Sequence, residues 1–557
     1  MPEPRRTRPP RPWPPRPRPA GARRVLAALL AVLLPAAALV SCTAERRDAG
    51  PGVIIAYGSE PQNPLVTTNT NESGGGDILQ NLYAGLVRYA PDGSIINDHA
   101  ESIEANDDGT EFRFRLKPGW TFTNGEPVTA HSYVDAWNYG AYGPNTQFQQ
   151  SFFDLIEGYD EVSPADSEVA ELRGLEVVDD LEFIVRLNRP EATFPLRLGH
   201  ATYMPLPQVA FEDMAAFGEH PIGNGPYMLA EGDAWLHNNS LTTVANPDFA
   251  GEHKPRNNGI LFRFYSDPDT AYADLLSGRL DTIGSTVPPT AMASFETDFP
   301  ESSYNGPTAS SQAFIIPEWL PHFAGEEGRL RRAAISLSID RGLITDKIFF
   351  GTRTPAVEFT ALTLGDVDAD VPGNEVLGHD PERARRLWAE ADAISAWDGV
   401  FEISYNADGG HQPWVEAVAN MVHDTLGIEA HGRAYPTFKQ LRDEVSGRSI
   451  DTAFRSGWLG DWPSVNNFLE PLYGSGGASN DGDYANPEFD ALLDRAAAAP
   501  DTGAAAAAYR DAQAILMRDL PAIPLWYPNA SVAWNPELRG VEIMWNAYPD
   551  YRVIEKD

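Results

Sequence analysis

Several segments of the chain have the residue pattern of strands. Residues 111–116 (EFRFRL) and 181–187 (LEFIVRL) alternate apolar and polar side chains, which is typical of a strand with one exposed face. Short apolar runs at residues 53–57 and 260–265 predict two more strands. The first of these leads into residues 58–71, which are rich in Pro, Asn and Thr and are expected to form a loop.

Helix signals are clearest in the second half of the chain. Asp380, Pro381 and Glu382 form an N-terminal capping sequence before the amphipathic run ERARRLWAEA. Residues 412–426 also predict a helix, which ends at Gly427 and leaves room for a strand at residues 428–430. A strand, a helix and a strand in this order favour α/β layers.

Two further segments complete the outline of the second half. The Ala-rich residues 502–520 predict a helix that Pro521 ends, and the Gly- and Ser-rich residues 473–482 predict a loop. The 557 residues, of which 42% are hydrophobic, are too many for one compact core and are expected to form several.

The charge of the chain limits its partners. There are 42 Lys and Arg residues against 79 Asp and Glu, so the formal net charge is −37. This charge opposes phosphate backbones and anionic membrane surfaces. We therefore expect no nucleic-acid partner.

The N-terminus has the composition of an export signal. Residues 1–24 contain eight arginines and one acid, and residues 25–40 are apolar but too short for a comfortable membrane span. Residues 39–42 (LVSC) resemble a bacterial lipobox, and Cys42 is the single cysteine of the chain. We predict a signal peptide at 1–41, a lipid on Cys42 and a tether at 42–51. Arg23 and Arg24 leave the export route, general or twin-arginine, undecided.

Signatures of common enzymes are absent from the sequence. There is no GxSxG, no phosphate-binding GK[ST] loop, no HExxH and no EF-hand loop. His411, Glu416 and His423 could be imagined as metal ligands, although an ordinary polar helix surface explains them equally well. We expect no enzyme activity and no cofactor.

A series of short motifs, in order along the chain, resembles one protein family. It is the peptide-binding family (family 5) of bacterial ABC-transporter extracellular solute-binding lipoproteins, of the oligopeptide- and dipeptide-binding type. The matching segments are 81–87 (NLYAGLV), 107–116 (DDGTEFRFRL), 120–130 (WTFTNGEPVTA), 225–227 (GPY), 246–249 (NPDF), 277–281 (SGRLD), 329–341 (RLRRAAISLSIDR), 378–391 (GHDPERARRLWAEA) and 457–469 (GWLGDWPSVNNFL). They span essentially the whole chain after the signal peptide.

The resemblance implies an α/β fold of two lobes that close like a clamp, as in periplasmic binding proteins, with an extra subdomain on the first lobe. By matching segments we place the first lobe at residues 52–82, 206–304 and 521–557. The extra subdomain is expected at 83–205 and the second lobe at 305–520.

The resemblance also implies a function outside the cytoplasm. The protein would be anchored to the cell membrane by the lipid on Cys42, act as a monomer, and capture short oligopeptides for the permease and ATPase of an ABC importer. Two alternatives within the fold are an oligosaccharide or metal-chelate ligand, and a peptide-sensing role in signalling. A secreted hydrolase with an unrecognised site is a further alternative.

Burial of a zwitterionic peptide requires an opposite charge, or a dense set of hydrogen bonds, for each of its ends. In peptide-binding relatives the aspartate of a G-W-x-x-D-aromatic motif holds the amine, which implies Asp461 here. Arg455 falls where some relatives have an arginine near the ligand carboxylate. If residues 455–461 are extended, both side chains leave one face. The alternatives are a turn-initiating role for Asp461 and a surface ion pair for Arg455.

Backbone groups are expected to bind the rest of the peptide. Gly457 and Leu459 flank Trp458 on the approach to Asp461, and extended segments of this kind pair with extended ligands. Ser73, by resemblance, lies in a loop that supplies backbone contacts from the first lobe.

Three further side chains are candidates for contacts with the ligand. Trp458 and Trp462 are expected to line side-chain pockets, with a place in the hydrophobic core as the alternative. His411 aligns with a histidine that reaches the carboxylate end of the ligand in some relatives.

Overall fold

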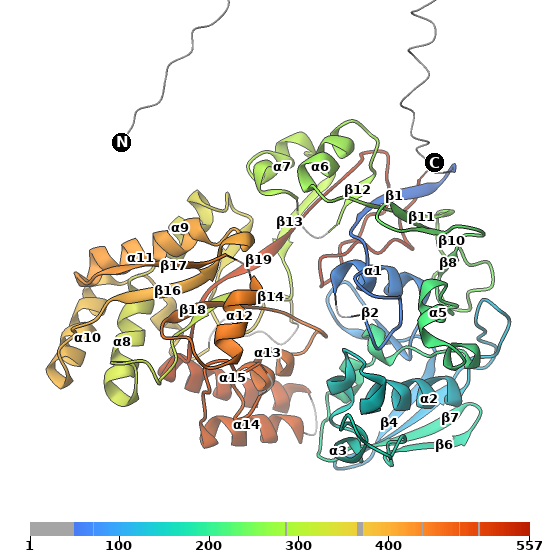
Figure 1. Cartoon of the computed structure of the whole chain (residues 1–557), viewed down its shortest axis with the longest axis horizontal. Coiled ribbons are helices and arrows are strands. Elements are labelled where there is room, and N and C mark those ends of the chain that lie inside the picture. Colours follow the sequence, from blue (N-terminus) through green and yellow to red (C-terminus); the bar gives the residue numbers. More distant parts are fainter. Residues whose placement is uncertain are drawn as a thin grey trace, which may run out of the picture. The chain divides into compact units, whose positions relative to one another are not determined.

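The computed structural model describes residues 50–70, 72–284, 287–364, 371–436, 438–477, 479–499 and 502–556 (Figure 1). The predicted signal peptide, the lipobox cysteine Cys42 and most of the predicted tether lie outside these residues. Gly50–Asp557 forms one compact unit. None of its described helices combines the length and the apolar character that crossing a membrane requires.

One large mixed sheet runs through the unit. Within the described residues its order is β17-β16-β18-β14-β19-β12-β1-β11-β10-β8, with β9, β13 and β15 paired at its sides. Its strands are β1 (Val53–Gly58), β8 (Tyr227–Leu229), β9 (Trp235–Leu236), β10 (Ser240–Ala245), β11 (Gly259–Phe264), β12 (Thr282–Ile283), β13 (Ser303–Pro307), β14 (Ser310–Ile315), β15 (Arg353–Pro355), β16 (Phe401–Asn406), β17 (Ala430–Tyr435), β18 (Ala453–Leu459) and β19 (Ala522–Trp534).

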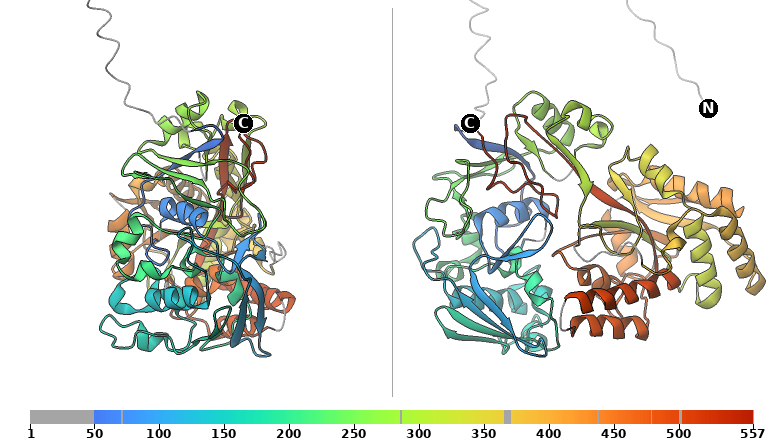
Figure 2. Two further views of the ribbon diagram at one scale, coloured as in Figure 1. Left: turned by 90° about the vertical axis from the view of Figure 1, so that its right-hand side faces the viewer. Right: turned by 180° about the vertical axis from the view of Figure 1, so that it is seen from behind.

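Strand β19 links the two halves of this sheet. Its first residues pair with β14, and its last residues pair with β12 and β13. Figures 1 and 2 show it crossing between the half that contains β1 and β11 and the half that contains β16–β18. Each half has its own hydrophobic core, and we call the halves the first and second lobe. The residue limits expected for the lobes from the sequence stay predictions.

Two smaller sheets belong to the first lobe. One has four strands in the order β4-β5-β7-β6, and the other is the hairpin β2-β3. Their strands are β2 (Val87–Tyr89), β3 (Ile95–Asn97), β4 (Ala100–Ala105), β5 (Glu111–Leu116), β6 (Leu175–Asp179) and β7 (Glu182–Arg186). The alternation in β5 buries Phe112 and Phe114, which pack in the core of the first lobe.

Helices cover the sheets. They are α1 (Ser73–Leu82), α2 (Ala130–Ala141), α3 (Tyr159–Val162), α4 (Phe194–Arg197), α5 (Met214–Glu219), α6 (Pro268–Leu276), α7 (Phe295–Asp298), α8 (Gly325–Leu337), α9 (Arg341–Lys347), α10 (Pro381–Ile394), α11 (Gln412–Leu426), α12 (Phe438–Ser446), α13 (Asn466–Tyr473), α14 (Pro487–Ala497) and α15 (Thr502–Asp519).

The strongest sequence signals are confirmed. The Asp380 side chain accepts a hydrogen bond from the Arg383 amide at 2.9 Å and so caps α10. Helix α11 ends at Gly427, which has a φ of +72° and donates its amide to the His423 carbonyl. The strand expected at residues 428–430 is wrong in position, because it begins only at Ala430, where pairing with β16 starts.

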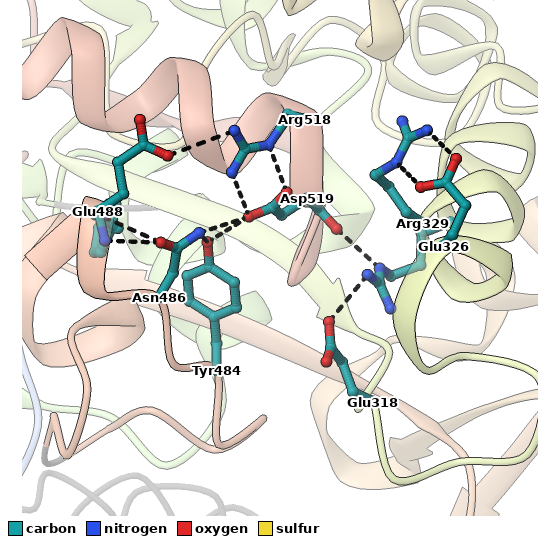
Figure 3. Close-up of polar contacts among 10 residues, drawn as sticks. Glu318, Glu326, Arg329, Tyr484, Asn486, Glu488, Arg518 and Asp519 are labelled. Atoms are coloured by element: carbon teal, nitrogen blue, oxygen red, sulfur yellow. Dashed lines mark hydrogen bonds and ion pairs between the residues drawn. The ribbon is translucent and has the colours of Figure 1, made fainter.

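A polar network fixes the end of α15 (Figure 3). The Asp519 carboxylate accepts hydrogen bonds from the Tyr484 hydroxyl at 2.8 Å, from Asn486 at 2.9 Å and from Arg518 at 2.8 Å. Its carbonyl accepts another from Arg332 of α8 at 2.9 Å. Because the last carbonyls of a helix have no partner within it, this bond from a buried arginine joins α15 to α8.

Candidate functional site

The motif around Trp458 lies at the end of β18, on a strand with one partly open edge. On one side β14 pairs with β18 throughout, from Phe454 to Leu459. On the other side the parallel pairing with β16 covers only Ala453 and Phe454 within the described residues. From Arg455 onward no described strand pairs with this second edge. Such an edge presents backbone amides and carbonyls to a further extended chain.

Gly457 and Leu459 lie on this segment. Both are exposed, and the Leu459 side chain is 52% exposed although it is apolar. Asp461 follows two residues after the strand ends, so strand alternation does not set the direction of its side chain. Residues 455–461 therefore do not form one continuous strand, and a face shared by Arg455 and Asp461 stays a prediction.

Asp461 is fixed by Asn467 of α13. The Asp461 amide donates to the Asn467 Oδ1 at 2.9 Å, and the Asn467 Nδ2 donates to the Asp461 carboxylate at 3.1 Å. This reciprocal pair fixes the position of the carboxylate. Burial raises the pKa of Asp461, while the hydrogen bond from Asn467 and the charge of Arg197 oppose that rise.

Asp461 lines a cavity of about 640 Å³ between the two lobes. One wall comes from the second lobe, with Trp458, Trp462, α13 and the loop before α14. The opposite wall comes from the first lobe, with Phe152, Asp154 and two arginines, Arg189 and Arg197. A volume of this size suits a small ligand.

The two walls meet at Trp462. Its side chain is 8% exposed, and Phe152 packs edge-on against it with the ring centres 5.6 Å apart. The guanidinium of Arg197 lies 4.5 Å from the centre of the same ring and 3.7 Å from the Asp154 carboxylate. Trp462 thus lines the cavity and is also buried.

Two further contacts connect the same walls nearby. Arg189 forms an ion pair with Glu470 of α13, and the Ala192 amide donates to the Ala497 carbonyl at 2.8 Å.

Sequence reasoning missed the residues of the first-lobe wall, because no motif marks them. Asn467 lies inside the quoted motif GWLGDWPSVNNFL, and its amide side chain was a signal that could have been used.

Arg455 lies in a neighbouring, smaller cavity of about 210 Å³. Its Nε donates to Asn406 at 2.8 Å, and its guanidinium lies 4.8 Å from the centre of the Phe438 ring. Gly457 lines the same cavity. Trp458 lines both cavities and donates its indole N–H to Asn467 at 3.2 Å. Trp458 thus lies between Asp461, the predicted acid in the larger cavity, and Arg455, the predicted base in the smaller one.

Ser73 does not lie in a loop, and this expectation is corrected. It is the first residue of α1, because the Glu72 carboxylate caps the helix by accepting bonds from the Gly74 and Gly75 amides at 2.7 and 2.9 Å. Its carbonyl accepts a bond from the Tyr548 hydroxyl at 3.4 Å. Ser73 lines none of the cavities described above.

His411 immediately precedes α11, beyond the end of β16. Its Nδ1 accepts a hydrogen bond from the Trp414 indole at 3.1 Å. His423, in contrast, contacts the Ile428 carbonyl through its Nδ1 at 2.7 Å. Among the described residues no group of three His, Cys, Asp or Glu side chains is arranged to hold a metal ion, so the imagined cluster with Glu416 is not brought together.

Comparisons with known proteins agree on one family. The family model described as bacterial extracellular solute-binding proteins, family 5, matches residues 94–480. The periplasmic oligopeptide-binding protein OppA of Haemophilus influenzae is 27% identical over 92% of this chain and 94% of its own length. The oligopeptide-binding protein OppA of Bacillus subtilis is 25% identical over 85% of this chain and 86% of its own.

Solved structures show the same fold. The periplasmic murein tripeptide binding protein MppA, in its unliganded open form, superposes with a TM-score of 0.76 at 22% identity and covers 91% of this chain and 98% of its own. OppA of Haemophilus influenzae in complex with the peptide RPPGFSPFR gives 0.71 at 24% identity, with 91% and 99% covered. The prediction of a two-lobed α/β fold is confirmed.

Proposed function

Because the chain belongs to the bacterial extracellular solute-binding proteins of family 5, we propose that it captures short oligopeptides outside the cytoplasm for an ABC importer. The family predicted from the sequence motifs is confirmed, and its members are binding proteins rather than enzymes. The names of the relatives support a peptide ligand, since they are oligopeptide- and dipeptide-binding proteins.

The open edge of β18 is the observation that carries this proposal. From Arg455 to Leu459 no other strand pairs with β18 on the side away from β14, within the described chain. A peptide that adds to this edge binds through its main chain, so its sequence matters little. The exposed apolar side chain of Leu459 and the half-buried Trp458 lie where they can cover it.

The charges at the two ends of this edge set the direction of the peptide. The ammonium of the ligand binds Asp461, beyond the carboxyl end of β18, and the carboxylate binds Arg455 near its start. The peptide therefore runs antiparallel to β18, past Trp458, from the larger cavity to the smaller one. From Arg455 to the end of β18 at Leu459 the chain spans about 13 Å, and three or four ligand residues span about 10–14 Å. The long side chain of Arg455 reaches the ligand carboxylate at its end of the edge, with His411 on the same side.

Contacts on both sides of the ligand favour a closed arrangement of the lobes. Trp458, Trp462 and Asp461 belong to one wall and Arg197 to the other. A ligand that contacts both walls binds the closed state better than the open one and so shifts the population toward it. The closed form is the one presented to the permease and ATPase, while the lipid on Cys42 keeps the protein at the membrane.

The identity of the ligand is tested by mass spectrometry of molecules released when the purified protein is denatured. Short peptides of varied sequence are expected. Calorimetry then compares tri- and tetrapeptides with their N-acetylated forms, which should bind far more weakly. Release of an oligosaccharide or a metal chelate, or equal affinity for acetylated peptides, would contradict the proposal.

Import and signalling share this capture step. Uptake of a labelled tripeptide by cells with and without the gene separates them, and we expect uptake to require the gene. Affinities that cluster across tripeptides of varied sequence also favour import, since a nutrient importer must accept many sequences.

A further inference from the structure

A third cavity lies within the first lobe, beside the site described above. It has a volume of about 100 Å³, well above the roughly 10–15 Å³ that one water requires. Its walls are α1, the residues that follow it up to β2, and the C-terminal segment from Met544 to Arg552. Figure 2 shows the dark red C-terminal segment running beside the blue helix α1.

The charged groups that line this cavity do not balance. The acidic groups are Asp77, Asp98 and Asp550, and the basic groups are Arg88 and Arg552. The Arg552 guanidinium pairs with Asp550 through two hydrogen bonds of 2.8 Å. One negative charge more than positive remains when all five groups are ionised.

When it is ionised, Asp77 carries this excess charge. Asp98 is buried, but the charges of Arg552 and Arg88 act on it and offset its own. Asp77 is 8% exposed and has the phenols of Tyr548 and Tyr551 near it instead of a cation. Burial accordingly raises the pKa of Asp77 to about 7, although a hydrogen bond from Tyr551 acts to lower it.

Tyr83 gives a second and independent indication of a ligand. Its side chain lines the cavity and is 2% exposed. Its hydroxyl is buried and has no hydrogen-bond partner among the described residues. Since a buried hydroxyl without a partner costs free energy, an occupant of the cavity that bonds to it would be stabilised.

The wall of the cavity lies near the Asp461 turn. Tyr89 lines it, and its pKa is raised by burial and by the charges of Tyr203 and Asp461. Trp545, another lining residue, accepts a hydrogen bond from the Ala309 amide at 3.2 Å, and the Ala309 carbonyl accepts one from Gly460 at 2.8 Å. Two hydrogen bonds thus lead from the cavity wall to the residue before Asp461.

We propose that this cavity binds a basic side chain of the captured peptide, with the side-chain ammonium next to Asp77 and Tyr83. The inference rests on the proposed peptide-binding function and adds a ligand class to it: peptides with a lysine near the amino end. The ammonium supplies the missing positive charge and three donors, for which Asp77 and the Tyr83 hydroxyl are acceptors. The aliphatic stem of the lysine packs along the aromatic wall of Tyr89 and Trp545.

The test compares lysine with norleucine, which has the same length without the charge. Calorimetry at pH 8, where Asp77 is ionised, measures the affinity of the protein for tri-alanine. It also measures the affinity for variants of this peptide that carry lysine or norleucine at each of the three positions. At one position lysine should bind about 10- to 100-fold more tightly than norleucine, as expected for a charge-assisted hydrogen bond. Peptides with arginine at that position should gain less, because the guanidinium is larger and planar.

Two variants and a control assign this preference to the cavity. Asp77→Asn should reduce the lysine-to-norleucine ratio below about 3 and leave norleucine binding nearly unchanged, and Tyr83→Phe should reduce the ratio partly. Asp160→Asn removes the same charge from the exposed helix α3 and should preserve the ratio. Thermal melts of each variant verify that it is folded.

The outcomes separate the two claims. If no tripeptide binds, the proposed peptide function is wrong and the lysine subsite fails with it. If the peptides bind but lysine and norleucine are equivalent at every position, the subsite alone is wrong. The same holds if Asp77→Asn keeps the full preference, or if Asp160→Asn removes it.

Discussion

The guanidinium of Arg197 lies 4.5 Å from the centre of the Trp462 ring. Arg197 is buried, with 7% of the residue exposed. Arg197 is the last residue of α4 in the first lobe, and Trp462 follows Asp461 in the second lobe. A buried positive charge from one lobe is thus placed beside the acid of the other. The charge of Arg197 opposes the rise that burial causes in the pKa of Asp461, and its contact with Trp462 holds the aromatic wall of the cavity.

Replacement of Arg197 or Trp462 by Ala should weaken peptide binding. Loss of the cation–π contact is expected to cost about 0.5–2 kcal/mol, or about 2- to 30-fold in affinity. Calorimetry with one tripeptide on Arg197→Ala, Trp462→Ala and the double variant measures the coupling. The double variant should lose less than the sum of the two single losses. Arg115→Ala, on the exposed face of β5, is the control and should bind normally. Full additivity would show that the two residues act separately.

Replacement of Asp461 should abolish recognition of the ligand amine. Asp461→Ala leaves a buried ammonium without its partner, which typically costs about 2–5 kcal/mol, or roughly 30- to 5000-fold in affinity. Asp461→Asn should cost less, because the amide oxygen still accepts a hydrogen bond.

N-acetylation of the peptide is the matched control for this variant. It should weaken binding to the wild type strongly and to Asp461→Ala little, since one interaction is lost only once. If calorimetry finds that the two losses add in full, the amine is held elsewhere.

Binding should also close the lobes. Small-angle scattering is expected to show a fall in the radius of gyration when the protein is saturated with peptide, because a ligand that contacts both walls favours the closed state. The variant Asp461→Ala at the same peptide concentration should remain open. An unchanged radius at saturation of the wild type would rule out the clamp.

Replacement of Asp519 should destabilise the second lobe. Asp519→Ala leaves the donors of Tyr484, Asn486 and Arg518 without their acceptor, at a cost of about 1–3 kcal/mol in the free energy of unfolding. Urea unfolding followed by circular dichroism measures it, with Glu390→Gln, on the exposed face of α10, as the control.

The effect of Asp519 should depend on pH. Burial alone would raise the pKa of Asp519, but the hydrogen bonds from Arg518 and Tyr484 outweigh it and hold this pKa below its usual value. The unfolded chain therefore binds the proton more readily, so the contribution of Asp519 is present above about pH 4 and is lost as the pH falls further. The stability difference between wild type and Asp519→Asn should shrink over that range. A difference that grows on acidification would contradict this assignment.

Cys42 should carry the lipid anchor. In cells labelled with a radioactive fatty acid, the wild type should take up label and fractionate with membranes, and Cys42→Ala should do neither. Thr43→Ala serves as the control and should be labelled normally. Labelling that persists in Cys42→Ala, or a free thiol in the mature wild type, would exclude the lipobox.

The sequence by itself determined the elements whose signals are local. Helix α10 begins where Asp380 and Pro381 predict, and α11 ends at Gly427, because caps and glycine act within a few residues. The order of the family motifs likewise predicted the two-lobed fold. The G-W-x-x-D-aromatic motif pointed to Asp461 because its residues are contiguous.

Only the tertiary structure decided which side chains lie opposite Asp461. Arg197 and Phe152 reach the cavity from another lobe, and no pattern within their own segments marks them, since such contacts depend on how distant elements pack. The same reason separates Arg455 from Asp461, because β18 ends before Asp461 and Trp458 stands between their cavities. Asp77 lies on the amphipathic helix α1, and its carboxyl group becomes buried beside Tyr548 and Tyr551 only because the C-terminal segment packs against that helix.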